Sequence, residues 1–383
     1  MSQQTSNKPT VKLNFKALKI KEKVTNWYVK ATESKWTCFF IITSIVQSII
    51  AIVMEIIIVE RNENASWEFQ VQAQNDTCIS YSVDRINNIY GENIIFILFN
   101  IFQVWFCFNA IVNQNTIQII TIAVINYLIG IFGIIQIVEI EKWKKTAIEN
   151  CNLSSFDSYD LQIVSHELPL IILSLLCATL MGFLTWKLYQ AFGWNIYKKI
   201  GADPKMQGIY RTMLIFVMLL KLDLFFMIVM SIEVCTVFKV NEQGARNLSA
   251  PLYVIHAVVT GSLFLLQTLA YRSLNKESHL GTKIFIGMLP LVIADFIMLL
   301  VKSTTASKQD SWYFLIIYII SGIIMAILTF IWAIFLLKNF DKGLKKHLCQ
   351  MNLDVSPYDA TSETHSTGTR PGSPIRWAID DDD

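Results

Sequence analysis

Apolar residues in this chain form long blocks. They do not alternate with polar residues every few positions, as they do in a soluble domain. Eight such blocks come close to or exceed the roughly 20 residues that cross a hydrocarbon core of about 30 Å. They cover residues 37–59, 93–112, 116–140, 168–187, 209–237, 251–271, 282–301 and 311–338. The pattern predicts an all-α fold, a polytopic transmembrane helical bundle of about eight spans.

The polar ends of the chain frame this membrane region. Residues 1–35 hold eight lysines and form either a short interfacial helix or a disordered basic arm. Residues 36–340 form the transmembrane domain. Residues 341–383 are rich in Ser, Thr, Gly and Pro and end in four aspartates, which is typical of a disordered tail. That tail is either plainly solvated or a cytosolic signal for sorting or adaptor proteins.

Composition supports the membrane assignment. The chain is 53% hydrophobic and 16% charged, whereas soluble domains carry about 25% charged residues. This excludes a soluble enzyme domain and a disulfide-dense secreted module. The expected partner is the lipid bilayer, and no nucleic-acid partner is expected. Composition leaves the oligomeric state undetermined.

The basic residues set the orientation. With the N-terminus in the cytosol, 22 of the 32 lysines and arginines fall in cytosolic segments, nine fall outside, and Lys221 lies within a span. This agrees with the positive-inside rule and places both termini in the cytosol. The four glycosylation sequons all fall on the lumenal side under this topology, so a glycoprotein is expected; they begin at Asn64, Asn75, Asn152 and Asn247.

Two cysteines lie in the long lumenal loops predicted for residues 59–92 and 141–167. Cys78 and Cys151 would form a disulfide in an oxidising compartment, and Cys235, near a lumenal helix end, is the alternative partner. Aromatic rings at the ends of the apolar blocks are expected at the level of the lipid headgroups; they are Trp36, Trp143, Trp186, Trp194, Trp312 and Tyr313.

The block that contains Lys221 and Asp223 raises the question of chemistry, because a charge at the centre of a lipid-facing helix costs about 2.5–3.5 kcal/mol. These residues must therefore face the bundle interior. Asp295 lies at a similar depth in a helix of the same direction, which predicts a Lys221–Asp295 ion pair. Because Asp223 is about 200° from Lys221 around the helix, it faces another group. The site is either a midplane substrate or proton site or a charge pair that fixes helix register.

Glu55, Glu233 and His256 form a second group of candidates nearer the lumen. Similar depth is the only feature that links them. They either converge on a protonatable vestibule or are hydrogen-bonded independently of one another.

The segment between Lys187 and Arg211 is a basic, aromatic cytosolic connector. It is either a plain positive-inside loop or a helical extension that turns at Gly201 and Pro204. In the second case Lys198 and Lys199 would meet anionic headgroups.

Motifs of soluble enzymes are absent from the sequence: there is no P-loop, GxGxxG after a strand, HExxH, GxSxG or Cys-x-x-Cys. The five histidines are scattered and do not define a metal site. We therefore expect no enzymatic activity, no metal and no cofactor.

The run FGWNIYKKIGADPKMQGIYRTMLIFVMLLKLDLFF and the first span, KWTCFFIITSIVQSIIAIVMEIII, resemble an uncharacterised fungal family of Golgi apparatus multi-pass membrane proteins. The resemblance covers roughly residues 30–340. It implies a location in the membrane of the Golgi or another endomembrane and a polytopic helical fold. It brings no activity, cofactor or functional residue.

Three functions are compatible with these observations. A transporter- or channel-like bundle would use the charged midplane interior. A non-catalytic membrane scaffold or cargo-trafficking factor would act through its cytosolic tail. A receptor resembling seven-transmembrane proteins fits less well, because the chain has an eighth span.

Overall fold

The computed structural model describes residues 29–72, 77–151, 163–200, 203–237, 239–240, 247–310 and 312–342. The long helices in this part are α2 (Lys35–Gln72), α3 (Thr77–Val112), α4 (Thr116–Cys151), α5 (Ile163–Ile200), α6 (Pro204–Val237), α7 (Ala250–Lys276), α8 (His279–Asp310) and α9 (Tyr313–Lys338). All eight are long and apolar enough to cross a membrane. The predicted helical bundle of about eight spans is confirmed.

Several helices continue well past their apolar segments. The expected lumenal loop 59–92 is largely helical, because α2 runs to Gln72 and α3 begins at Thr77. The expected loop 141–167 is likewise shortened by α4 and α5. Residues 60–72 and 141–151 contain no glycine or proline, so nothing in these polar segments stops the helix where the membrane ends.

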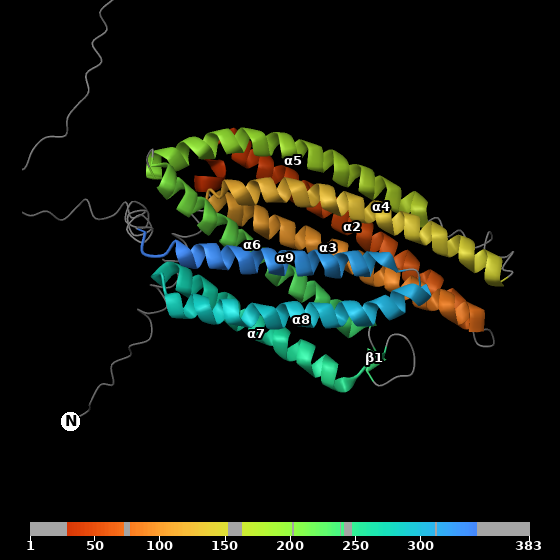
Figure 1. Ribbon diagram of the computed structural model, residues 1–383. Helices are drawn as coiled ribbons and strands as arrows, with labels where there is room; N and C mark the ends of the chain where they lie inside the picture. The colour runs from red at the N-terminus through yellow and green to blue at the C-terminus, as the bar shows by residue number, and fades with distance from the viewer. Residues whose placement is uncertain are drawn as a thin grey trace, which may run out of the picture.

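Helix α6 is the centre of the bundle. Of its apolar segment, 67% is buried, against 22–50% for the other spans. It contacts α3 and α4 on one side and α7 and α9 on the other. Figure 1 shows it crossing diagonally between the group formed by α2–α5 and the group formed by α7–α9. The polar side chains of α6 therefore face protein on several sides.

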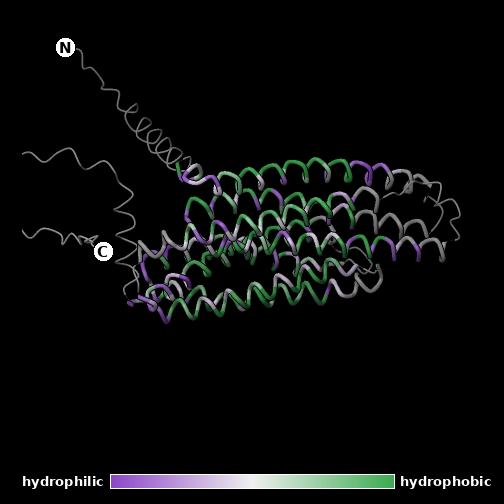
Figure 2. Tube along the Cα trace, turned by 90° about the horizontal axis from the view of Figure 1, so that it is seen from above, coloured by the Kyte–Doolittle hydropathy of each residue, from purple (hydrophilic) through white to green (hydrophobic). Residues whose placement is uncertain are grey.

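The helices are apolar outside and partly polar inside. In α2, Phe39, Ile42 and Val46 are about half exposed, whereas Gln47 and Glu55 are buried. Figure 2 shows hydrophobic residues along the middle of the helices and hydrophilic ones mainly toward their ends. Little water reaches either the lipid-facing surface or the packed interior of the bundle. The buried polar side chains therefore depend on one another for hydrogen bonds.

The cytosolic ends are tied together by polar contacts. Lys30 Nζ donates to the carbonyl oxygen of Val112 at the C-terminus of α3 (2.9 Å). His279 and Asp341 share a hydrogen bond of 2.7 Å beside the α7–α8 turn. An even number of spans brings both ends of the described chain to one side of the bundle. Residues 1–28 of the predicted arm (1–35) and residues 343–383 of the predicted tail (341–383) lie outside the described residues.

The connector between α5 and α6 is short, because α5 extends to Ile200 and α6 begins at Pro204. This agrees with a helical extension of α5 and not with a plain loop, whereas the predicted turn at Gly201 lies outside the described residues. The side chains of Lys198 and Lys199 are outside the described residues, so their contact with headgroups stays a prediction.

The lumenal connection between α6 and α7 includes a two-residue parallel pair, β1 (Lys239–Val240) with β2 (Asn247–Leu248). Asn64 is exposed on the lumenal part of α2. Asn75 and Asn152, and the side chains of Asn247, Cys78 and Cys151, lie outside the described residues, so glycosylation and the disulfide stay predictions. Cys235, the alternative partner, is a free thiol whose Sγ lies 3.3 Å from the Tyr253 hydroxyl.

Two tryptophan side chains do not lie at the level of the lipid headgroups, where the sequence predicts them. Trp143 and Trp312 are buried, each about 2% exposed or less, because their helix ends face inward at the lumenal end of the bundle. Trp36 and Trp186 are exposed as expected. Trp312 instead donates its indole N–H to Glu92 Oε1 (2.5 Å).

Candidate functional site

Lys221 is held by two amide side chains at the cytosolic end of the α3–α4 hairpin. Its ammonium group donates to Asn109 Oδ1 and to Gln118 Oε1, the latter at 3.0 Å. The rings of Trp105 and Phe106 lie 6.0 Å away. The predicted pair with Asp295 is therefore wrong: Asp295 bonds to His256, which meets α6 at Ser231, ten residues nearer the lumen than Lys221. Through its two hydrogen bonds, Lys221 connects the α3–α4 hairpin to α6.

Asp223 faces a different neighbour, as its angular offset from Lys221 predicts. It is 7% exposed, and neither carboxyl oxygen has a hydrogen-bond partner in the described part of the chain. The hydroxyl of Thr329, on α9, lies close by but outside hydrogen-bonding geometry. A carboxylate without a partner in this environment is very unfavourable, so the group must take up a proton or a cation.

Asp295 belongs to a chain of hydrogen bonds that joins α6, α7 and α8. Its Oδ2 lies 2.8 Å from His256 Nδ1. His256 Nε2 lies 3.3 Å from Ser231 Oγ, which in turn lies 3.0 Å from Thr260 Oγ1. His256 and Asp295 are both less than 5% exposed. Such a chain can pass a proton between neighbouring groups, since imidazole both donates and accepts.

The order Ser231–His256–Asp295 is that of a serine hydrolase triad, yet the surroundings do not support nucleophilic catalysis. Ser231 lies inside α6, where backbone N–H groups are used within the helix, and its hydroxyl donates to the Met227 carbonyl (2.8 Å). An oxyanion hole needs donors that are free and aimed at the reacting carbonyl. The helical setting of Ser231 therefore favours a hydrogen-bond relay.

The lumenal carboxyls do not meet His256 in one vestibule. Glu233 is electrostatically coupled to Glu92, and its oxygens lie close against Gly91 of α3, about 3.2 Å from where a Cβ would stand. Glu55 is coupled instead to Glu167 of α5. The structure thus separates Glu55, Glu233 and His256 into three neighbourhoods, because each helix turns its polar residue toward a different partner.

A network of buried amides was missed by reasoning from charged residues alone. Gln47 of α2 donates to Asn126 of α4 (2.7 Å) and accepts from Gln103 of α3 (3.3 Å). Nearer the lumen, Gln136 donates to Asn93 (2.8 Å). Interhelical hydrogen bonds of this kind contribute about 0.6 kcal/mol each in membrane bundles. The network therefore fixes the rotation of three helices more than it stabilises the fold.

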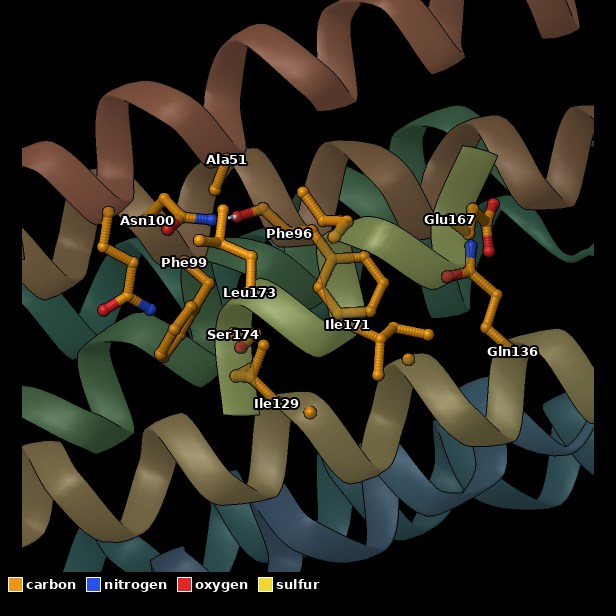
Figure 3. Close-up of a pocket in the computed structure, with 14 residues that line it drawn as sticks. Ala51, Phe96, Phe99, Asn100, Ile129, Gln136, Glu167, Ile171, Leu173 and Ser174 are labelled. Atoms are coloured by element: carbon orange, nitrogen blue, oxygen red, sulfur yellow. Dashed lines mark hydrogen bonds between the residues drawn. The ribbon is translucent and has the colours of Figure 1, made fainter. Parts of the chain in front are cut away.

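A small cavity opens beside this network among α2, α3, α4 and α5 (Figure 3). Its volume is about 30 Å³, which is enough for water, since one water needs roughly 10–15 Å³. Polar groups on its wall include Gln47, Asn100, Gln136, Glu167 and Ser174. Gly130 and Gly133 of α4 also line it and allow close contact with α5.

Metal ligation has no support in the described residues, where no three His, Cys, Asp or Glu side chains are grouped to hold an ion.

The contacts of Asp295 predict the outcome of two double-mutant cycles. Lys221→Met and Asp295→Asn should be additive in unfolding free energy to within about 0.5 kcal/mol, because these residues do not touch. His256→Ala and Asp295→Ala should be coupled by about 1 kcal/mol. Unfolding by sodium dodecyl sulfate in mixed micelles measures both. A Lys221–Asp295 coupling as large as that of His256–Asp295 would contradict the assigned contacts.

Comparison with known proteins supplies a family likeness. The chain is 22% identical over 277 residues to the UPF0658 Golgi apparatus membrane protein C23H3.04 of Schizosaccharomyces pombe, covering 66% of this chain and 76% of the relative. This chain is similar to a fungal Golgi membrane protein. The predicted resemblance and the predicted location, a multi-pass protein of the Golgi apparatus membrane, are thereby confirmed. No family model matches the chain, and no solved structure matches it.

Proposed function

We propose that the protein is a proton-coupled solute transporter of the Golgi membrane, with Asp223 as the carboxyl that takes up and releases the proton. The observation that carries the proposal is the buried Asp223 carboxyl, which lacks a hydrogen-bond partner in the described residues at the centre of the most buried helix. Structural carboxyls in membrane proteins are normally paired. In the proposed cycle the carboxyl gains a partner in a second state, which is the change expected of a coupling site.

Further polar groups follow α6 from Asp223 toward the lumen, and in the proposed cycle they would relay the proton. Asp295 and His256 form a hydrogen-bonded pair on the α7–α8 side of α6, and the carboxyls of Glu92 and Glu233 lie toward the lumen. The cavity among α2–α5 has room for about 30 Å³, which fits water and not a larger solute. In the proposed cycle, substrate would enter after α2–α5 move relative to α6–α9.

A scaffold that acts through its tail is the alternative, and truncation separates the two functions. Golgi vesicles would be isolated from cells that lack the protein and from cells that re-express the full chain or a chain without residues 350–383. Small solutes in the vesicles would be compared by mass spectrometry. A transporter predicts that the truncated chain, where it still reaches the Golgi, restores the full-chain solute profile. If the truncated chain gives the profile of cells without the protein, the scaffold function is favoured.

A further inference from the structure

A second pocket, of about 360 Å³, lies at the cytosolic ends of α4, α5 and α6, away from the polar core. It exists because α4 begins at Thr116, whereas α5 and α6 project beyond that point toward the cytosol (Figure 1). The notch left beyond α4 is lined on one side by Ile117, Ile120 and Leu214. Its volume falls in the range of about 300–1,000 Å³ that holds small molecules.

The pocket lies at the level of the lipid headgroups. Lys187 of α5 places its ammonium over the rings of Trp186, Trp36 and Phe183, at 4.5, 5.7 and 5.8 Å. Trp186 and Trp36 are exposed, and exposed tryptophan beside lysine marks the membrane interface. Tyr189, on the pocket wall, follows Lys187 by two residues and is half exposed. The pocket therefore opens where headgroups and the first part of the acyl chains meet.

The polar side of this second pocket contains a positively charged side chain and no acidic one. Arg211, Gln207 and Tyr189 line it, and none of the lining residues is acidic. Arg211 is exposed and forms no ion pair with a described residue. A guanidinium presents two parallel N–H donors that match the oxygens of a phosphate. Basic pockets between spans on the cytosolic side suit acidic headgroups.

We propose that this notch binds an anionic glycerophospholipid of the cytosolic leaflet. The phosphate contacts Arg211, the hydroxyl of Tyr189 donates to the headgroup, and the start of an acyl chain lies along Ile117, Ile120 and Leu214. Exposure of Ile120, at 40%, gives the chain a way out into the bilayer. The site is independent of Asp223 and of the proposed transport, and it ties the α5–α6 connector to the membrane surface.

Native mass spectrometry of the purified full-length protein in detergent tests the site. Phosphatidylserine, phosphatidylinositol 4-phosphate and phosphatidylcholine would each be added to the wild type, Arg211→Ala and Arg272→Ala. Arg272 is an exposed arginine at the cytosolic end of α7 and serves as the matched control. We expect anionic lipid to bind the wild type and Arg272→Ala equally and to lose about fivefold in occupancy with Arg211→Ala, since one basic group near the surface contributes about 1 kcal/mol.

Further arms separate the lipid from other anions. Ile120→Trp, at a partly exposed position of the apolar wall, should also lower lipid occupancy while leaving the thermal unfolding midpoint near that of the wild type. Inorganic phosphate in excess should not displace the lipid. Equal binding by Arg211→Ala and Arg272→Ala, equal binding of phosphatidylcholine, or displacement by free phosphate would each overturn the proposal.

Discussion

Replacing Asp223 by asparagine is expected to abolish transport while leaving the protein folded in the Golgi. Asparagine keeps the size of the side chain but can neither release a proton nor carry charge. Golgi vesicles from cells that express Asp223→Asn should therefore show the solute profile of cells without the protein. Because the carboxyl has no hydrogen-bond partner among the described residues, the substitution breaks no bond seen in this state, and thermal stability should equal or exceed that of the wild type.

Asp203→Asn is the matched control for this experiment. Asp203 precedes the same helix, is exposed, and accepts a hydrogen bond from the backbone N–H of Lys205 (3.0 Å). Its replacement should retain the wild-type solute profile. A wild-type profile from Asp223→Asn would remove Asp223 from the transport cycle. A large loss of abundance with Asp223→Asn would instead assign the residue a structural role.

Substituting Gly133 by alanine is expected to cause a large loss of stability. A Cβ at this position would stand 2.7 Å from Ile171 Cγ1 and 3.1 Å from its Cδ1. Ile171 is buried and β-branched, so it has little freedom to move away. Overpacking of this kind costs about 1–3 kcal/mol. The thermal unfolding midpoint in detergent should fall by several degrees.

Two companion variants make the result specific to helix packing. Gly261 of α7 has nothing within 4 Å of its Cβ position, so Gly261→Ala should be neutral or stabilising by up to about 1 kcal/mol. Adding Ile171→Ala to Gly133→Ala should recover part of the loss by returning space between α4 and α5. A midpoint for Gly133→Ala equal to that of Gly261→Ala would mean that the two helices do not approach so closely.

Helix count was predictable from the sequence, because each span is long, apolar and separated from the next by polar residues. The charged residues of α6 also indicated that this helix faces the bundle interior. The side-chain contacts between the helices were not predictable in this way. The equal depth expected for Lys221 and Asp295 was wrong, because Asp295 meets α6 through His256 at Ser231, ten residues beyond Lys221. Counting residues from the end of an apolar block gives neither the tilt of a helix nor its rotation, and these decide which neighbour a side chain meets. For that reason Lys221 binds Asn109 and Gln118, and Asp295 binds His256.

The amide network had a detectable signal that charge-based reasoning overlooked. In α2 the polar residues Ser44, Gln47, Ser48 and Glu55 recur at spacings of three, four and seven and are all buried. The large apolar residues occupy the other, lipid-facing side. A period of 3.6 among polar positions in an apolar helix therefore indicates its inward face. The same test would have shown that Glu55 faces the bundle, although not that Glu167 is its neighbour.

The proposed transport requires Asp223 to hold an exchangeable proton within the membrane. Dicyclohexylcarbodiimide, an apolar reagent, modifies protonated carboxyls inside membranes, and peptide mass spectrometry identifies the residue labelled. Labelling of Golgi membranes should modify Asp223, should decrease as pH rises, and should be absent at this position from Asp223→Asn. If the peptide that contains Asp223 stays unmodified at every pH while other membrane carboxyls react, Asp223 is not the coupling site.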